Sequence, residues 1–424
     1  MVYKSASKEA LLTEKETLLK QYEQYKAKGL SLNMARGKPS PEQLDVSMPM
    51  LDTLHSTVDY NAQDGLDCRN YGELDGIFEC KKLFAEIMGV NPDSVFVGGN
   101  SSLNMMFDTI SAFMTDSPYN DLEPWFNIKD RKFLCPVPGY DRHFGITGYF
   151  GFEMITVPMN SDGPDMDIIE KLVSEDSSIK GIWCVPKYSN PTGITFSDEV
   201  VKRFANLKPA AKDFRIMWDN AYAVHDVNDT PDTLLNIVDE CEKSGNVDMP
   251  IVFCSTSKIT FSGAGVAAMS ASKLNMDFLK KRYTYATIGY DKINMLRHAK
   301  FFGDFKGLKK HMQKHKELLS PKFSTVIDKL NSNFKDNGIA EWTNPNGGYF
   351  VSVDVYPGTA KKVVELCKNA GVVLTGAGAT FPNSMDPEDK NIRIAPSFPS
   401  VEELSLAMDI FCVCVKLAAI DKFI

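Results

Sequence analysis

The chain has 424 residues, of which 43% are hydrophobic and 24% are charged, a composition typical of a soluble globular protein. Its formal net charge of -8 argues against a nucleic-acid binder, because phosphate contacts need a surplus of Lys and Arg. The short basic cluster "GLKKHMQKHK" at 307–316 indicates a solvated helix face. Nine cysteines without CxxC or His–Cys spacing argue against a disulfide framework and against a metal site such as zinc.

The N-terminal segment has no apolar core of signal-peptide length, and no later window approaches the roughly 18 apolar residues of a membrane span. We therefore expect a cytoplasmic protein without membrane contact. The first predicted element is an amphipathic helix that Gly29 can end. Its apolar face consists of Leu11, Leu18, Tyr22 and Tyr25.

From about residue 75 onward, short apolar runs alternate with helical segments. The runs are "SVFVGG", "KFLCPV", "FEMITVPM", "GIWCVP", "FRIMWD", "IVFCSTS" and "GVAAMS". They are continuously apolar rather than alternating, which is typical of strands covered on both faces. The pattern predicts an α/β fold with a mainly parallel seven-stranded sheet between helices.

After about residue 290 the pattern changes to long helices, such as 309–333. It continues with "GGYFVSVDV", a helix at 359–370, "NIRIAPS" and a last helix from Val401, which together predict a smaller α+β domain. We expect an N-terminal segment (1–54) that packs with the small domain, a large domain (55–300) and the small C-terminal domain (301–424).

Functional residues of an open parallel sheet gather at the carboxyl ends of its strands, so the residues that follow each apolar run are the candidates. They are Gly99, Asn100, Ser101 and Ser102, then Tyr140, Asn190, Asp219 and Tyr222, and finally Ser255, Ser257 and Lys258. Together they suit pyridoxal phosphate (PLP). This cofactor needs a lysine to form a Schiff base, a carboxylate for its ring nitrogen and hydrogen bonds to its phenolic oxygen. It also needs a stacking partner for its ring and a helix N-terminus for its phosphate.

The motifs "YSNPTG", "WDNAY", "STSK" and "IRIAP", in that order, resemble those of the fold type I PLP-dependent aminotransferases of class I/II, and the likeness covers nearly the whole chain. "NMARGKPSPEQLD" and "NYGELDGIFECKKLFAEIMGV" resemble a bacterial subgroup of aspartate aminotransferases related to MocR-type aminotransferase domains. The resemblance implies the PLP-dependent transferase fold and a ping-pong transfer of an amino group to 2-oxoglutarate. Aspartate is the best candidate for the donor.

The resemblance implies that Lys258 holds the cofactor and moves the substrate α-proton as a general base. Asp219 pairs with the ring nitrogen, while Tyr222 and Asn190 bond the phenolic oxygen. Read alone, Asp219 is equally a turn residue that caps the next helix. For "SNPTG" an ordinary Asn-Pro turn is the alternative.

At the phosphate, the resemblance implies a cradle at the N-terminus of a helix. Its members are Gly99, Asn100 and Ser101, with Ser255 and Ser257 from the lysine loop. Tyr140 stacks on the ring, and Tyr71 reaches the phosphate of a neighbouring subunit, so the resemblance implies a homodimer with shared active sites. A plain strand-to-helix turn is the alternative for 99–102, and a core tyrosine is the alternative for Tyr140.

For the substrate, the resemblance implies that the planar fork of Arg393 binds the α-carboxylate; a structural salt bridge is the alternative. Gly37 lets the backbone approach the same carboxylate, and Arg36 is a candidate for a side-chain carboxylate. One position departs from the family, since Val266 stands where an arginine usually neutralises the phosphate. Either Arg297 takes that role, or hydroxyls and backbone amides suffice.

Three competing hypotheses stay open. "GAGVAA" at 263–268 matches the dinucleotide fingerprint of a dehydrogenase, but it lies deep in the chain and Asp277 follows too early for the acidic partner. A second hypothesis keeps PLP but takes another amino acid or carries out C–S lyase chemistry. A third is a non-catalytic PLP-binding regulatory domain, although the sequence offers no candidate for the winged helix that such regulators carry.

Overall fold

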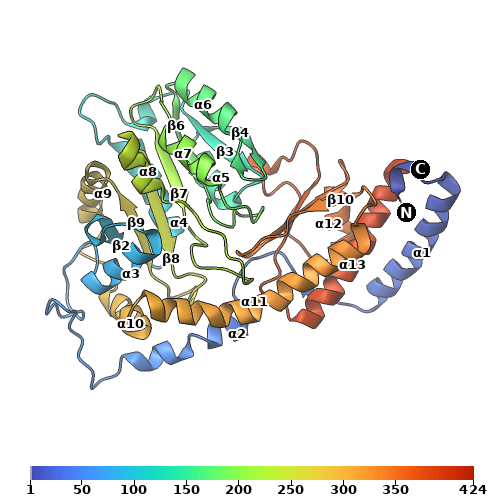
Figure 1. Cartoon of the computed structure of the whole chain (residues 1–424), viewed down its shortest axis with the longest axis horizontal. Coiled ribbons are helices and arrows are strands. Elements are labelled where there is room, and N and C mark those ends of the chain that lie inside the picture. The colour runs from blue at the N-terminus through green and yellow to red at the C-terminus, as the bar shows by residue number, and fades with distance from the viewer. Residues whose placement is uncertain (1) are drawn as a thin grey trace.

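The largest element of the fold is a twisted sheet (Figure 1), and its strands are buried along most of their length except for Glu153–Asn160. The computed structural model describes residues 2–424. Within them the sheet consists of β2 (Val95–Val97), β3 (Lys132–Val137), β4 (Glu153–Asn160), β5 (Gly163–Pro164), β6 (Ile179–Cys184), β7 (Arg215–Asp219), β8 (Pro250–Ser255) and β9 (Ala267–Ala271). The strand order is β2-β9-β8-β7-β6-β3-β4-β5.

Strands β4, β3, β6, β7 and β8 pair in parallel, whereas β9 is antiparallel to β8 and β2, and β5 is antiparallel to β4. The predicted mainly parallel α/β sheet is therefore confirmed, and each of the seven predicted runs overlaps a strand. The strand count was wrong by one. The additional strand, β5, is a two-residue edge strand whose Gly-Pro sequence carries no apolar pattern.

Helices cover both faces of this sheet (Figure 1). Neighbouring residues of β7 point to opposite sides, since Met217 belongs to one apolar core and Trp218 to another. The covering helices are α3 (Phe78–Met88), α4 (Ser102–Thr115), α5 (Asp141–Tyr149), α6 (Met166–Glu175), α7 (Asp198–Ala205), α8 (Ile237–Ser244), α9 (Lys273–Ala286) and α10 (Lys292–Phe302). Burial on both faces explains why most of the strands are continuously apolar, but the expectation of two covered faces was wrong for β4, which lies near the edge of the sheet and has one buried residue, Val157.

A smaller antiparallel sheet follows, formed by β10 (Ala340–Trp342), β11 (Val351–Val355) and β13 (Asn391–Ile394). Its helices are α11 (Phe305–Phe334), α12 (Ala360–Asn369) and α13 (Val401–Phe423), close to the predicted bounds. Helix α11 extends from α10 to β10, and so joins the regions of the two sheets (Figure 1).

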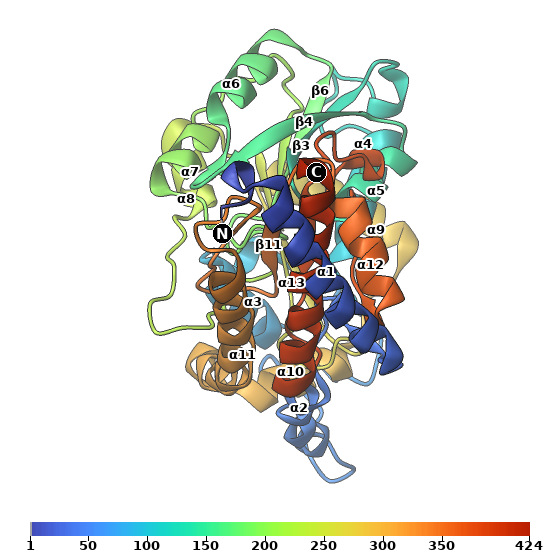
Figure 2. The same ribbon diagram turned by 90° about the vertical axis from the view of Figure 1, so that its right-hand side faces the viewer.

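The N-terminal segment folds back onto this second region. Helix α1 (Lys8–Ala27) lies beside α13 (Figure 2), and buried Leu11, Leu18 and Tyr22 join the apolar core that α13 fills. Strand β1 (Leu32–Asn33) then pairs with β12 (Val372–Val373), and α2 (Pro41–Asp45) packs against α11. The division into 1–54, 55–300 and 301–424 stays a prediction.

Short 3-10 turns complete the described elements, at Tyr3–Ser5, Met48–Thr53, Pro92–Ser94, Trp125–Asn127 and Pro382–Ser384. The nine cysteines are buried and free, as their spacing predicts. Among the helices that the structure describes, none is both long enough and apolar enough to cross a bilayer. Residues 2–424 also contain no group of three or more His, Cys, Asp or Glu side chains placed to hold a metal ion.

Candidate active site

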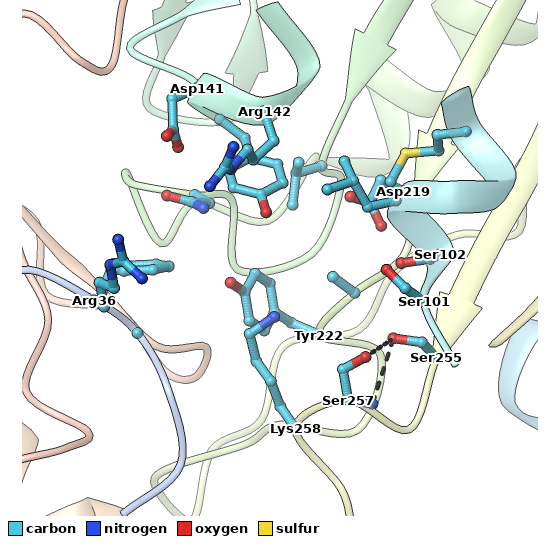
Figure 3. Close-up of a pocket in the computed structure, with 18 of the residues that line it drawn as sticks. Arg36, Ser101, Ser102, Asp141, Arg142, Asp219, Tyr222, Ser255, Ser257 and Lys258 are labelled. Atoms are coloured by element: carbon cyan, nitrogen blue, oxygen red, sulfur yellow. Dashed lines mark hydrogen bonds between the residues drawn. The ribbon is translucent and has the colours of Figure 1, made fainter. Parts of the chain in front are cut away.

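A cavity of about 450 Å³ lies where the parallel strands end and the second region begins (Figure 3). Most of the predicted site residues line it, although they come from segments that are far apart in the sequence. They are Arg36, Gly37, Ser101, Tyr140, Asn190, Asp219, Tyr222, Ser255, Ser257, Lys258 and Arg393. The fold therefore gathers an amine, a carboxylate, several hydroxyls and several guanidinium groups around one space.

Lys258 follows β8 in a turn that hydroxyl groups stabilise. The hydroxyl of buried Thr256 accepts a hydrogen bond of 2.9 Å from the backbone N–H of Val266, which ties the two sides of the turn together. Burial lowers the pKa of the Lys258 amine, and the charge of Asp219 opposes that shift. A lysine in such surroundings loses its proton more readily than a surface lysine, as a nucleophile or general base must.

Asp219, the last residue of β7, presents one anchored and one free oxygen. Its Oδ2 lies 3.0 Å from Nε2 of His143, whose ring stacks on Trp183 at a centroid distance of 4.4 Å and an angle of 12°. Within residues 2–424, Oδ1 of Asp219 is buried and has no hydrogen-bond partner. A buried carboxylate oxygen of this kind calls for a donor from a bound group.

Sequence reasoning missed His143, although a signal for it exists. It lies three residues after Tyr140, a spacing that places both on the same side of the start of α5. The two rings meet edge to face, with centroids 4.9 Å apart at 75°.

The phenols of Tyr140 and Tyr222 both face the cavity. Burial raises the pKa of Tyr140 to about 12 and raises the pKa of Tyr222 well above its ordinary value, with the charge of Asp219 adding to both. Both groups therefore stay protonated at neutral pH and are available as hydrogen-bond donors.

Arg393 of β13 is held in place from three sides. Its Nη1 donates to Oδ1 of Asn190 at 3.1 Å and to Oδ1 of Asp141 at 3.4 Å, and its Nη2 donates to the hydroxyl of Thr375 at 3.3 Å. The guanidinium carbon lies 4.8 Å from the ring centroid of Phe350. Asp141, Thr375 and Phe350 were not predicted. They fix the guanidinium group in the cavity wall, and an edge with open N–H groups there suits a bidentate carboxylate.

The absence of a side chain at Gly37 lets the ring of Phe350 lie close to the backbone. A Cβ atom at this position would come within 2.4 Å of the Phe350 ring, so the absence of a side chain permits the packing of the Phe350 ring that lies under Arg393. Arg36 lines the neighbouring wall, as does Arg142, which sequence reasoning did not single out. In the described part of the chain, neither arginine has an ion-pair partner.

The serines gather at the other end of the cavity. The hydroxyl of Ser255 donates to that of Ser257 at 3.0 Å (Figure 3), and Ser257 in turn lies 3.5 Å from the backbone oxygen of Asn100. Ser101 is the N-cap residue of α4, and its hydroxyl makes no capping hydrogen bond. An open helix N-terminus with several hydroxyls around it suits an anion.

Four predicted or candidate residues, Gly99, Asn100, Arg297 and Tyr71, lie outside the cavity lining. Gly99 and Asn100 are not among the lining residues, and the backbone oxygen of Gly99 accepts a hydrogen bond of 2.8 Å from the N–H of Ala267. Their part in the phosphate cradle stays a prediction. Arg297 also lies outside the lining and donates to Oδ1 of Asn294. In Figure 3, Arg36 and Arg142 lie away from the serine end.

Tyr71 is not part of the cavity lining and is 79% exposed, which leaves its ring available to another molecule. The glycines of "GAGVAA" form the turn that leads into β9, an antiparallel strand, whereas a dinucleotide fingerprint opens a helix after a strand. The dehydrogenase hypothesis is therefore wrong.

Comparisons with known proteins agree with this geometry. The family model described as aspartate amino-transferase matches residues 6–424. The chain is 48% identical to an aspartate aminotransferase of Corynebacterium glutamicum, over 96% of this chain and 94% of that protein. It also resembles the solved structure of an aspartate transaminase from the same organism, with a TM-score of 0.97 and 46% identity over 100% of both chains.

A more distant structure shares the fold. It is an α-aminoadipate aminotransferase from Thermus thermophilus, solved with N-(5'-phosphopyridoxyl)-L-leucine. Its TM-score is 0.74 at 17% identity, and the match covers 99% of this chain and 97% of that chain.

Proposed function

The chain belongs to the aspartate aminotransferase family, and from this premise we propose that it moves the amino group of aspartate to 2-oxoglutarate with PLP as its cofactor. The chain is an aminotransferase of fold type I. The observation that supports the proposal best is the meeting, in one cavity, of the Lys258 amine, the open oxygen of Asp219 and the fixed guanidinium of Arg393.

The residues fit the cofactor. Asp219 would hold the protonated ring nitrogen of PLP, which would supply the donor that its Oδ1 lacks. Tyr222 and Asn190 would hold the phenolic oxygen, and Tyr140 would stack on the ring. The hydroxyls of Ser101, Ser255 and Ser257 would hold the phosphate together with the N-terminus of α4, where the backbone of Gly99 and Asn100 shapes the turn. Val266 is buried beside them and brings no charge.

Lys258 would bind the cofactor covalently and act as the general base. Its lowered pKa leaves the amine able to take the proton from the substrate Cα and to return it later. Bound PLP would supply an electron-withdrawing ring that makes this proton acidic. Arg393 would bind the α-carboxylate through the guanidinium N–H groups that Asn190, Asp141 and Thr375 leave open, and this would set the direction in which the Cα–H bond points.

Three finer points belong to the same proposal. Arg36 would pair with the second carboxylate of aspartate, and Arg142 on the neighbouring wall is available for the same group. Tyr71 would reach the phosphate of a partner subunit, so that the active enzyme is a homodimer. We propose the cytoplasm as its location.

An absorbance spectrum tests the proposal. Purified protein supplied with PLP should show a visible band that aspartate bleaches and 2-oxoglutarate restores, and a Lys258→Ala variant should lack the band. A band that aspartate leaves unchanged, but another amino acid bleaches, would contradict aspartate as the donor. Absence of any band in the native protein would contradict the cofactor assignment.

A further inference from the structure

A hydrogen-bonded path leads from the N-terminal segment to the backbone of the reactive lysine. The amide Nε2 of Gln43 donates to the hydroxyl of Tyr349 at 2.9 Å, and that hydroxyl donates to the carbonyl oxygen of Lys258 at 3.4 Å. The side chains of Gln43 and Tyr349 are completely buried. Neither residue lines the cavity, and the proposed mechanism uses neither.

The capping box of α2 decides which way these bonds run. Oε1 of Gln43 accepts the backbone N–H of Ser40 at 3.2 Å, which turns the amide nitrogen toward Tyr349. The second hydrogen of that nitrogen points to Nδ1 of His315 at 3.1 Å. Since Gln43 donates to the Tyr349 oxygen, the phenol proton is free for the carbonyl of Lys258.

The ring of Tyr349 also lies near the lysine amine. Nζ of Lys258 is 5.0 Å from the ring centroid of Tyr222 and 5.9 Å from that of Tyr349, and the two rings stack at 6.1 Å and 24°. Tyr349 thus touches Lys258 at its backbone and faces it at the end of its side chain. It also supports the phenol that would bind the cofactor.

The segment that carries Tyr349 is joined to the loop after β7. The backbone N–H of Gly348 donates to the oxygen of His225 at 2.8 Å, and that of Val227 donates to the oxygen of Asn346 at 2.9 Å. Gly347 fits there because a Cβ atom would lie 2.2 Å from the Tyr188 ring. The hydroxyl is therefore held in place relative to Asp219 and Tyr222 as well.

We propose that Tyr349 and Gln43 are positioning residues: through the Gln43–Tyr349–Lys258 path they fix the backbone of the lysine and so the aim of its amine. The proposal rests on the assigned role of Lys258. It also means that Gln43 of the N-terminal segment and Tyr349 of the smaller-sheet region together fix Lys258, which belongs to the large-sheet region.

Reductive methylation of the apoenzyme tests this without any cofactor or substrate. Formaldehyde with a cyanoborohydride modifies unprotonated amines, and mass spectrometry gives the rate at Lys258 as a function of pH. In Tyr349→Phe the ring stays but the tether is lost, so the amine becomes better solvated. We expect the midpoint of the pH profile to rise toward that of an ordinary lysine, by roughly half to one pH unit. In a separate assay of the enzyme with its cofactor, kcat should fall about 2- to 10-fold with little change in KM.

Gln43→Leu gives a second measurement on the same path. Leucine neither donates nor accepts, so the Tyr349 hydroxyl loses the donor that directs its proton to the Lys258 carbonyl, and no charge is added near the amine. We expect a smaller shift in the same direction as in Tyr349→Phe, and no further shift in the double variant, because the path ends in one bond to Lys258. If Tyr349→Phe does not fold, the Gln43→Leu shift alone decides.

Tyr356→Phe is the matched control, because Tyr356 lies in the same region, packs against Phe423 and is not in the cavity lining. It should leave the pH midpoint at the native value. An unchanged midpoint in folded Tyr349→Phe, or additive shifts in the double variant, would overturn the proposal. Failure of the amino-transfer assay would not affect this result, since the labelling needs no turnover.

Discussion

His143 and Asp219 form a buried pair in which Nε2 of the imidazole lies 3.0 Å from Oδ2 of the carboxylate. The pair joins the first turn of α5 to the end of β7, two segments 76 residues apart in the sequence. Stacking on Trp183 holds the imidazole ring, and the ring in turn holds the carboxylate with its other oxygen open. The orientation of Asp219 therefore depends on a residue outside its own strand.

His143→Ala should weaken PLP binding and lower kcat by about tenfold each, because one charge-assisted hydrogen bond is lost and Asp219 can rotate. Equilibrium titration with PLP, followed by absorbance, measures the affinity. His55→Ala is the control, since His55 is exposed and lies far from His143 in the sequence. Native affinity in His143→Ala would show that the aspartate is held without the imidazole.

The serine end of the cavity should recognise the phosphate without an arginine. Replacing Ser255 and Ser257 together by Ala should lower the affinity for PLP by about 10- to 100-fold, because bonds to a charged phosphate are lost. The affinity for pyridoxal, which has no phosphate, should stay nearly native. Equal losses for the two compounds would mean that the serines shape the loop rather than bind the anion.

Arg36→Gln should change the choice of substrate. We expect kcat/KM for aspartate to fall roughly 10- to 100-fold, because a charged hydrogen bond is lost, and kcat/KM for alanine to stay within about twofold. Steady-state assays with both donors give the ratio. Arg142→Gln, made alongside, shows whether the second guanidinium takes part. An unchanged ratio in Arg36→Gln would remove Arg36 from the substrate site.

Acid should destabilise the protein through its buried histidines. Burial lowers the pKa of His298 and of His315 from 6.5 to about 4. His298 donates from Nδ1 to the oxygen of Asn294 at 2.8 Å and accepts at Nε2 from Thr260 at 2.9 Å, which requires the neutral ring. Between about pH 6.5 and 4 the unfolded chain therefore binds more protons than the folded one, and the stability falls as the pH falls.

Urea unfolding at pH 7.5 and at pH 4.5 measures this loss, which should be a few kcal/mol. His298→Gln should be less stable at pH 7.5 but should lose less on acidification. If His298→Gln loses as much free energy of unfolding between pH 7.5 and pH 4.5 as the native protein, groups other than His298 cause the acid destabilisation.

Much of the site could be predicted because parallel strands end on one edge of their sheet. Asp219, Ser255 and Lys258 each follow an apolar run, so their meeting is a consequence of the strand pattern. Arg393 lies in another sheet, and only its motif indicated it. Gly99 and Asn100 show the limit of this reasoning, since position after a strand does not say which atoms face the cavity.

By itself, the sequence determined the α/β class, the order of the strands' apolar runs and the residue types at their ends, because these depend on local periodicity and turn chemistry. Only the tertiary structure decided which groups support them. His143 beneath Asp219, Asp141 and Thr375 around Arg393, and Tyr349 against Lys258 are contacts between distant segments. Such contacts depend on how whole elements pack, and packing direction leaves no mark in a short stretch of residues.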